Sequence, residues 1–524
     1  MTTPPADAPH EVELKLEVGE ADLARLARHP WLQELAEGRP TTRALRSVYF
    51  DTPDLALWQR GLVLRVREVG RRRIVGVKTR GVARGGLVAR EEREAPLAAG
   101  TRDVRLLAPA TLLAAIPDPG LRRAIERAVA GKRLAPRLET RVRRASRRLR
   151  HGTATLELAL DVGEVRAGRK HVPIHELELE RIGGPTRALY DVALRLVRDV
   201  ALRPGLVGKA ERGFALLAGR GPEPARAEHP AFARGATLEA VLAAVLGECL
   251  RQISANQAAA ERGDDPEGVH QMRVGVRRMR SALRLFRNQL PVRETDALVG
   301  ELRWLASVLG AARDLDVFEA ELMRPLAARR PDDAGLAALR EAAAGARREA
   351  YAALRSELAS ARYVTLVLRL GRFVDGASFR RRGESELAQP ARPLVRRLLR
   401  HRAAGIQQLG ERLGELSAAE LHRLRIRAKR LRYAVELLAP LVGSKAERAA
   451  RRLAELQDVL GHLNDQATAE ELVARLRERL PEVTPELTRA EGFVLGWAAN
   501  SASLGRERLA ETWRRVERLG PFWK

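Results

Sequence analysis

The spacing of apolar and polar residues changes near residue 220 of this 524-residue chain. Before that point, short segments alternate apolar and polar residues, which is the pattern of strands with one buried face. After it, apolar residues recur at helical spacing and β-branched residues become scarce. Residues 219–235 are rich in Gly and Pro and have neither period, so we interpret them as a linker. We therefore predict one domain over residues 1–218 and a second over residues 236–518.

The first domain is predicted to be an antiparallel-rich α+β fold with enough strands to close a barrel. The second is predicted to be an all-helical bundle whose helices are separated by short polar or Gly/Pro-containing breaks. The expected strands lie near 10–18, 43–51, 60–69, 72–80, 87–94, 136–149, 153–161 and 172–182, and the expected helices of the first domain near 20–28, 121–130, 185–202 and 206–218.

The second domain contains an internal repeat. A basic segment that begins at His270 is matched by one that begins at His422, an offset of 152 residues. Downstream, a Leu-Gly-x-x-x-Asp block at Leu309 is matched by another at Leu460, an offset of 151 residues. Two matched blocks at nearly the same offset predict two repeats, about 236–380 and 384–518.

Nearly every expected strand has one charged face, because side chains alternate across a strand. A single strand of this kind is typical of any half-exposed sheet. The whole set instead predicts a barrel with its charged faces inward, where carboxylates can hold hard divalent cations and Arg or Lys can hold phosphate oxygens. The shared faces are Glu11, Glu13 and Lys15; Arg65 and Arg67; Lys78; Arg90, Glu92 and Glu94; Arg141 and Arg143; Glu157 and Asp161; and Glu176, Glu178 and Glu180.

The formal net charge of +27 points to a polyanionic partner. Aromatic residues make up only 4% of the chain, which disfavours nucleic acid because single strands are usually bound by stacking on aromatic side chains. One cysteine, Cys249, excludes a disulfide within the chain. No stretch is apolar enough to span a membrane and no leader pattern is visible, so we expect a cytoplasmic protein.

Five short motifs in the first domain resemble those of the CYTH family, the triphosphate tunnel metalloenzymes. They are Glu11-x-Glu13-x-Lys15, Tyr49-Phe50-Asp51-Thr52-Pro53, Leu64-Arg65-Val-Arg67, Val77-Lys78-Thr79 and His175-Glu176-Leu-Glu178, followed by Gly208-Lys209-Ala-Glu-Arg212 at the end of the domain. The resemblance covers roughly residues 8–218. It implies an eight-stranded closed antiparallel β-tunnel with flanking helices that hydrolyses triphosphate compounds with Mg2+ or Mn2+.

The resemblance also implies roles for individual residues. Six carboxylates look like the metal site: Glu11, Glu13, Glu157, Asp161, Glu176 and Glu178. Six cations look like catalytic phosphate ligands: Lys15, Arg65, Arg67, Lys78, Arg143 and Lys209. Secondary substrate-binding candidates are Arg90, Arg141 and Arg212, and the choice between Arg141 and Arg143 stays open. No residue is assigned as a separate general base.

In each repeat of the second domain, helical spacing places a basic stripe beside an apolar one. A single copy would be interpreted as a solvated helix face, but two copies with the same spacing favour a shared anion-binding surface. The repeat resembles the CHAD domain, a conserved-histidine helical domain. This resemblance implies an all-α bundle of pseudo-two-fold symmetry that binds polyphosphate. The candidates are His270, Arg273, Arg277, Arg280, His422, Arg425, Lys429 and Arg432, with Arg278 and Arg430 one step off the stripe, and Asp314 and Asp465 as residues that orient arginines or cap helices.

The expected function is therefore hydrolysis of inorganic triphosphate or short polyphosphate in the barrel, with polyphosphate bound by the helices. The sequence leaves three alternatives open. They are class IV adenylate cyclase or thiamine triphosphatase activity on the same fold, a non-catalytic polyphosphate scaffold, and nucleic-acid binding.

Overall fold

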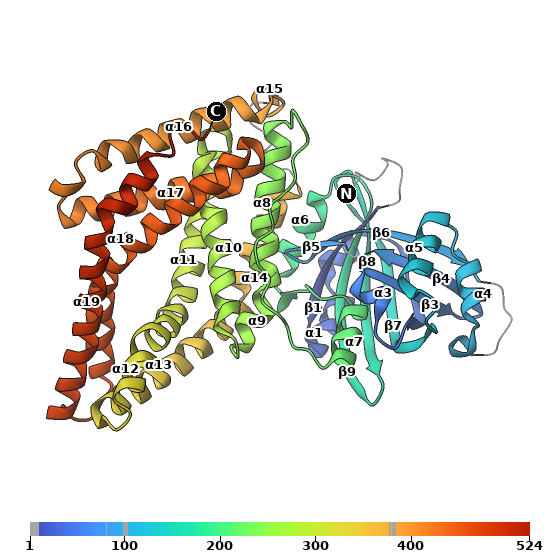
Figure 1. The fold of residues 1–524 in the computed structure, drawn as a ribbon. Helices are drawn as coiled ribbons and strands as arrows, with labels where there is room; N and C mark the ends of the chain where they lie inside the picture. The colour runs from blue at the N-terminus through green and yellow to red at the C-terminus, as the bar shows by residue number, and fades with distance from the viewer. Residues whose placement is uncertain (1–9, 80, 98–102, 377–378, 380–383, 524) are drawn as a thin grey trace. The chain divides into compact units, whose positions relative to one another are not determined.

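A computed structural model describes residues 10–79, 81–97, 103–376, 379 and 384–523. Contacts within the chain divide it into two compact units. The first consists of Met1–Glu223 together with Ala359–Ser378, and the second of Pro224–Leu358 together with Phe379–Lys524. The first unit contains the strands, and the second is helical (Figure 1).

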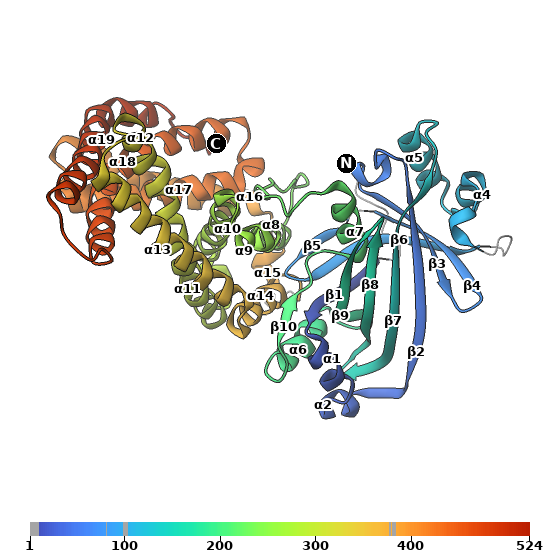
Figure 2. The same cartoon turned by 90° about the horizontal axis from the view of Figure 1, so that it is seen from below.

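The first unit is built around a closed antiparallel β-barrel, as the sequence predicts (Figure 2). Its strands are β1 His10–Val18, β2 Ala36–Asp51, β3 Leu62–Val69, β4 Arg72–Thr79, β5 Val82–Arg84, β6 Leu87–Pro96, β7 Ala135–His151, β8 Ala154–Ala167, β9 Lys170–Gly183 and β10 Leu202–Pro204. The closed ring runs β1-β9-β8-β7-β2-β3-β4-β6 and returns to β1. The short strands β10 and β5 add to β1 and β6.

Helices cover two regions of the outer barrel face. The helices of this unit are α1 Glu20–Ala27, α2 Pro30–Glu34, α3 Ala56–Gln59, α4 Pro109–Ala114, α5 Pro119–Val129, α6 Arg187–Leu196, α7 Lys209–Ala218 and α14 Ala361–Val374. Leu14 and Leu16 of β1 are fully buried in a cluster with residues of α1 and α6. Val66 of β3 lies in a second cluster with residues of α4 and α5. Because side chains alternate along each strand, the charged residues between these outward apolar ones point into the barrel.

One part of the barrel interior is apolar. Leu138 and Val142 of β7, Val165 of β8 and Ile174 of β9 form a buried cluster with Phe214 of α7. On each strand these residues lie an even number of positions from an inward charged residue. They therefore point into the barrel as well. The Phe214 ring stacks on Trp58 with 4.8 Å between ring centroids. The charged cavity therefore ends against an apolar layer closed by α7.

Helix α14 belongs to the first unit although it lies far along the chain. Val364 and Leu368 are fully buried in the same apolar cluster as Leu14 and α6. The linear boundaries predicted from the sequence assign all of residues 236–518 to the helical domain, whereas the contacts group α14 with the barrel.

In the part of the chain that the structure describes, the second unit is built of helices, with one isolated β-bridge between Thr237 and Pro390. Its main helices are α8 Leu238–Ala255, α9 Gln257–Arg262, α10 Pro266–Leu285, α11 Val292–Val317, α12 Arg324–Arg329, α13 Ala334–Ala359, α15 Glu384–Leu387, α16 Ala391–Gly410, α17 Ala418–Val442, α18 Ser444–Arg477 and α19 Pro485–Glu517. The Asp265 side chain caps α10, and a Ser417–Glu420 capping box begins α17. The two basic repeat segments lie on α10 and α17, and these two helices pack together.

Candidate active site

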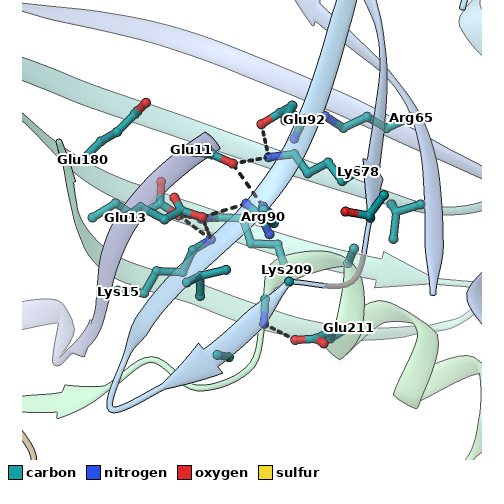
Figure 3. A pocket seen from close by; sticks show the side chains of 18 of the residues that line it. Glu11, Glu13, Lys15, Arg65, Lys78, Arg90, Glu92, Glu180, Lys209 and Glu211 are labelled. Carbon is teal, nitrogen blue, oxygen red and sulfur yellow. Dashed lines mark hydrogen bonds and ion pairs between the residues drawn. The ribbon is translucent and has the colours of Figure 1, made fainter. Parts of the chain in front are cut away.

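The barrel encloses a cavity of about 560 Å³ whose lining is mostly charged (Figure 3). Among the described residues, the lining contains seven cations, Lys15, Arg65, Arg67, Lys78, Arg90, Arg144 and Lys209, and eight carboxylates, Glu11, Glu13, Glu92, Glu94, Glu157, Glu178, Glu180 and Glu211. Opposite charges facing one another offset part of the cost of removing each from water.

Strand β1 supplies three of these side chains by simple alternation. Glu11, Glu13 and Lys15 line the cavity, while Leu14 and Leu16 point into the outer core. Glu13 and Lys15 are only 3% and 5% exposed, so neither can be a solvated surface charge. The Lys15 ammonium lies 3.2 Å from Glu13 and 3.1 Å from Glu178 on the neighbouring strand β9.

Strands β3 and β4 supply the cations on the other side of the cavity. Arg65 donates to Glu94 at 2.8 Å and to Glu92 at 2.5 Å. The Lys78 ammonium lies 2.6 Å from Glu92 and 3.2 Å from Glu11. Burial, followed by repulsion from Arg65 and Arg90, lowers the pKa of Lys78 to about 7. An additional anion near Lys78 would favour its charged form.

A first group of carboxylates, the Glu176 group, consists of Asp161, Glu176 and Glu178. Their oxygens lie within 4.8 Å of one another, so the group could hold a metal ion. It is already matched by cations: Lys209 contacts all three members, and Arg144 contacts Asp161 and Glu178. Arg212 pairs with Glu176, and Lys15 with Glu178. Three carboxylates thus share four cations.

A second group, the Glu180 group, consists of Glu11, Glu13, Glu157 and Glu180, all lining the cavity. Glu180 of β9 lies opposite Glu13 of β1 on one side and Glu157 of β8 on the other. Within the described part of the chain, no ion pair is recorded for Glu157 or Glu180. Burial, followed by repulsion from Glu11, Glu13 and Glu157, raises the pKa of Glu180 to about 7. Glu11 and Glu13 pair with Lys15, Lys78 and Arg90, so the charge that lacks a cationic partner among the described residues is that of Glu157 and Glu180.

Most of the sequence-predicted residues line this cavity or contact residues that do. Arg90 lies 3.0 Å from Glu11 and 2.7 Å from Glu13. Glu180, Glu92 and Glu94 were not predicted as site residues, although each shares a strand face with residues that were. The available signal was their even spacing from Glu178 and Arg90, two positions for Glu180 and Glu92 and four for Glu94.

Arg141 and Arg143 do not line the cavity, which corrects the sequence prediction that one of them binds phosphate. Both are exposed on the outer face of β7, and Arg141 pairs there with Glu139 at 2.6 Å. The neighbouring Arg144 occupies the interior instead, with two hydrogen bonds of 2.6–2.7 Å to Asp161. The reason is that Val142 faces the apolar part of the interior, so the apolar face of β7 is the inner one here.

The Tyr49-Phe50-Asp51 motif combines a cavity residue with a structural one. Tyr49 lines the cavity, and although burial opposes it, Arg65 and Arg67 lower the pKa of its phenol. Asp51 is fully buried and accepts hydrogen bonds from the backbone N–H groups of Thr52, Leu57 and Trp58. It therefore fixes the turn that carries Trp58 to the cavity.

The helical unit carries a concentrated basic surface where α10 meets α17. We call the residues Arg273, Arg277, Arg425, Lys429 and Arg432 the basic seam. Burial, followed by repulsion from the four arginines, lowers the pKa of Lys429 to about 8. In the described part of the chain, the buried Nε atoms of Arg277, Arg280 and Arg425 have no hydrogen-bond partner. Buried donors normally have partners, so these three guanidinium groups have donor capacity that the described protein atoms do not use.

The remaining predicted residues of this unit differ in their surroundings. His270 is half-buried, and burial followed by the nearby Arg313 lowers its pKa, whereas His422 is exposed. Arg278 is buried and donates to Gln252 at 3.0 Å, which is a structural contact. Burial raises the pKa of Asp314, while Arg273 opposes that rise. Arg430 is exposed, and the side chain of Asp465 lies outside the described part of the structure.

A closed antiparallel barrel with carboxylates and cations in one cavity, followed by a basic helical unit, defines a class of two-part proteins. Residues 9–206 match the CYTH domain family, and residues 244–474 match the CHAD domain family. The chain therefore belongs to the proteins that join a CYTH domain to a CHAD domain, as the motifs indicate.

The chain is similar to two uncharacterized proteins of Mycobacterium tuberculosis, MT2285 and Rv2226. Each is 30% identical over 263 residues, which is 49% of this chain and 50% of the relative, so the chain spans about half the length of the curated relatives it matches. Among solved structures, the CHAD domain of the plant Ricinus communis is 34% identical, with a TM-score of 0.47, over 55% of this chain and 97% of that one.

A second solved structure, HpAC1 from Hippeastrum, is described as an adenylyl cyclase candidate with a dominant triphosphatase activity. It is 17% identical with a TM-score of 0.30, over 40% of this chain and 95% of that one. Among the described residues, no helix combines the length and the apolar character needed to cross a membrane.

Proposed function

We propose that the barrel hydrolyses inorganic triphosphate and short linear polyphosphates with Mg2+ or Mn2+, and that the basic helical unit binds polyphosphate. The observation that carries this proposal is the mixed lining of the barrel cavity. Cations suited to phosphate oxygens and carboxylates suited to a hard cation face the same enclosed space. A cavity for a neutral ligand would not need either set.

The Glu176 group has the carboxylate oxygens that lie within 4.8 Å of one another, but the Glu180 group has the greater excess of negative charge for a divalent cation to neutralise. Carboxylate oxygens are the ligands that Mg2+ and Mn2+ take. The raised pKa of Glu180 reflects negative charge that such an ion would neutralise. Among the described residues, the four carboxylates of this group have three cationic partners, Lys15, Lys78 and Arg90, whereas the three of the Glu176 group have four. We therefore assign the ion to Glu11, Glu13, Glu157 and Glu180. Bound there, it would supply Lewis acidity and a water of lowered pKa.

The cations of the cavity would hold and orient the phosphate chain. Lys15, Arg65, Lys78 and Arg90 each contact glutamates now, and each would exchange part of that contact for phosphate oxygens. An adjacent anion favours the charged form of an amine, so phosphate would keep Lys78 protonated. Phosphoryl transfer depends mainly on such positioning and charge neutralisation. Arg144 and Lys209 would neutralise the carboxylates of the Glu176 group next to the bound phosphate chain.

The basic seam supports polyphosphate binding by the helical unit. A repeated anion can contact several cations at once, which a single phosphate cannot, and five cations of the seam come from only two helices. Fluorescence titration with a labelled polyphosphate should show binding that weakens steeply as salt is raised. Replacing Lys429 and Arg425 with Gln should weaken it far more than the same change at Arg348 and Arg355 on α13. Equal losses in both double variants would contradict a specific site.

The barrel assignment is tested by comparing three substrates with the full chain. Tripolyphosphate, ATP and thiamine triphosphate are each incubated with Mg2+ or Mn2+, and orthophosphate and cyclic AMP are measured. The proposal expects orthophosphate, with tripolyphosphate as the preferred substrate. Cyclic AMP formation would instead favour the cyclase alternative, and binding without turnover of any substrate would favour the scaffold.

A further inference from the structure

One contact joins the cavity wall to a segment far outside the CYTH match. Asp375 directly follows α14, and its side chain is 3% exposed. One of its oxygens accepts a 2.6 Å hydrogen bond from Arg84 Nε at the end of β5. The other accepts a 2.6 Å hydrogen bond from the hydroxyl of Tyr190 on α6. This carboxylate therefore ties the β5–β6 hairpin to two helices.

The β5–β6 hairpin is part of the candidate active site. Ala83 of β5, and Val88 and Arg90 of β6, line the cavity. The turn of the hairpin is bonded to the site lysine, since the backbone N–H of Lys15 donates to Gly86 O at 2.9 Å. Gly86 has a φ of +90°, and a Cβ there would lie 2.8 Å from the Lys15 carbonyl oxygen. Only glycine fits this close approach without strain.

Helix α14 is held firmly enough to act as a fixed support. Val364 and Leu368 are fully buried in the barrel's outer core. A Cβ on Gly371 would lie 2.3 Å from the Tyr190 ring, so the backbone of α14 packs directly on the Tyr190 side chain of α6. A separate ion pair joins Arg372 to Asp191 of α6 at 2.6 Å. The support is thus independent of the Asp375–Arg84 contact.

We propose that Asp375 is a positioning residue for the barrel site: through Arg84 it fixes the β5–β6 hairpin, and with it Lys15 and Arg90, in the arrangement that receives the phosphate chain. The catalytic part of this proposal rests on the proposed function of the barrel. The mechanical part does not, because it concerns only the hydrogen bonds that connect Asp375, Arg84, Gly86 and Lys15. The barrel site would then depend on a helix that lies within the CHAD match.

The energetic argument follows from burial and charge. A hydrogen bond to a charged group is stronger than a neutral one. Removing one partner leaves the other buried group without its hydrogen bond, which costs free energy. Asparagine at position 375 keeps the shape but loses the charge, so Arg84 would be held less tightly. The hairpin would fluctuate more, and Lys15 and Arg90 would spend less time in the receptive geometry.

The test uses the full chain with two matched variants, Asp375→Asn and Asp191→Asn. Each variant removes one carboxylate that fastens α14 to its surroundings: Asp191 bonds to Arg372 of α14, and Asp375 directly follows α14. Only Asp375 contacts the hairpin. Hydrogen exchange at the Lys15 amide should be faster in Asp375→Asn than in wild type and unchanged in Asp191→Asn. With tripolyphosphate, KM should rise about tenfold in Asp375→Asn, the size expected for one charge-assisted hydrogen bond, and kcat should change less. In Asp375→Glu, both the exchange rate at Lys15 and KM should lie between the values of wild type and Asp375→Asn.

The outcomes separate the two proposals. Unchanged exchange at Lys15 in Asp375→Asn, or an equal change in both variants, would overturn the positioning role. Faster exchange with an unchanged KM would overturn its part in substrate binding. Absence of any metal-dependent hydrolysis in wild type would refute the proposed function, while the exchange measurement would still decide the mechanical link. Equal melting temperatures of the two variants would confirm that a general loss of stability is not the cause.

Discussion

Replacing Glu180 with Gln should both stabilise the metal-free protein and remove its response to metal. Glu180 lies among Glu11, Glu13 and Glu157, and burial followed by these carboxylates raises its pKa from 4.5 to about 7. The folded protein therefore disfavours the ionised form of this side chain. Glutamine is nearly the same shape and carries no charge, so it removes the repulsion together with a proposed metal ligand.

The sign and size of the stability effect follow from proton linkage. Below pH 4.5 the carboxyl group is protonated in both folded and unfolded chains, so it imposes no penalty. Between pH 4.5 and about 7 the unfolded chain releases the proton while the folded chain keeps it, and stability falls. The full penalty is present above pH 7. At 1.36 kcal/mol per pKa unit it is at most about 3.4 kcal/mol, and partial solvent screening reduces it to about 1–2 kcal/mol.

The assay is urea unfolding in a chelator at pH 5 and pH 8, followed by thermal unfolding with added Mg2+ or Mn2+. Glu180→Gln should exceed wild type by about 1–2 kcal/mol at pH 8 and by much less at pH 5. Metal at 100 times its dissociation constant should stabilise wild type by about 2.7 kcal/mol and the variant by far less.

The matched control is Asp161→Asn in the Glu176 group. Asp161 is fully buried and paired with Arg144 and Lys209, so its loss leaves cations without a partner. It should destabilise the protein at both pH values, because removing one member of a buried pair is costly. The reasoning is refuted if Glu180→Gln is no more stable than wild type at pH 8, or if metal stabilises it as strongly.

Three further outcomes are expected. Arg144→Ala should lower tripolyphosphate hydrolysis by about 10²–10³-fold, as for other preorganised charge contacts, whereas Arg143→Ala should leave the rate within twofold of wild type in the same phosphate-release assay. Polyphosphate binding at constant ionic strength should weaken between pH 7 and pH 9, because Lys429, with a pKa of about 8, loses its charge as pH rises; Lys429→Arg should remove that pH dependence in a fluorescence titration. Gly371→Ala should lower the melting temperature, since its Cβ would overlap the Tyr190 ring, and an unchanged melting temperature would contradict the close packing of α14 on α6.

Much of the barrel could be predicted because strand alternation leaves little freedom. Once Leu14 and Leu16 are assigned to the outer core, Glu11, Glu13 and Lys15 must point inward. The same rule placed Arg65 and Lys78 correctly. The helices of the second unit followed from their apolar spacing in the same way.

The choice between Arg143 and Arg144 could not be made by alternation alone. The adjacent Val142 suggests an outward apolar face, but here it faces the apolar end of the barrel interior. The deciding fact is long-range: Arg144 lies opposite Asp161 in the β7–β8 pairing. A strand's own sequence does not contain that register.

Two other features also depend on tertiary contacts. His270 and His422 occupy matched positions in the repeat, yet one is half-buried and the other exposed, because neighbouring helices cover them differently. The apolar face of α14 shows that the helix must be buried but does not show against what. Its packing on the barrel unit, through Val364 and Leu368, could only be seen in the structure.

The central claim is that carboxylates and cations in one barrel cavity bring a divalent ion and a phosphate chain together. It is tested most directly by measuring orthophosphate release from tripolyphosphate by wild type and Glu13→Ala, with Mg2+ or Mn2+ and with a chelator. The account predicts metal-dependent release by wild type and a loss of at least about 10²-fold in the folded variant. Release that needs no metal, or that proceeds equally well in Glu13→Ala, would contradict it.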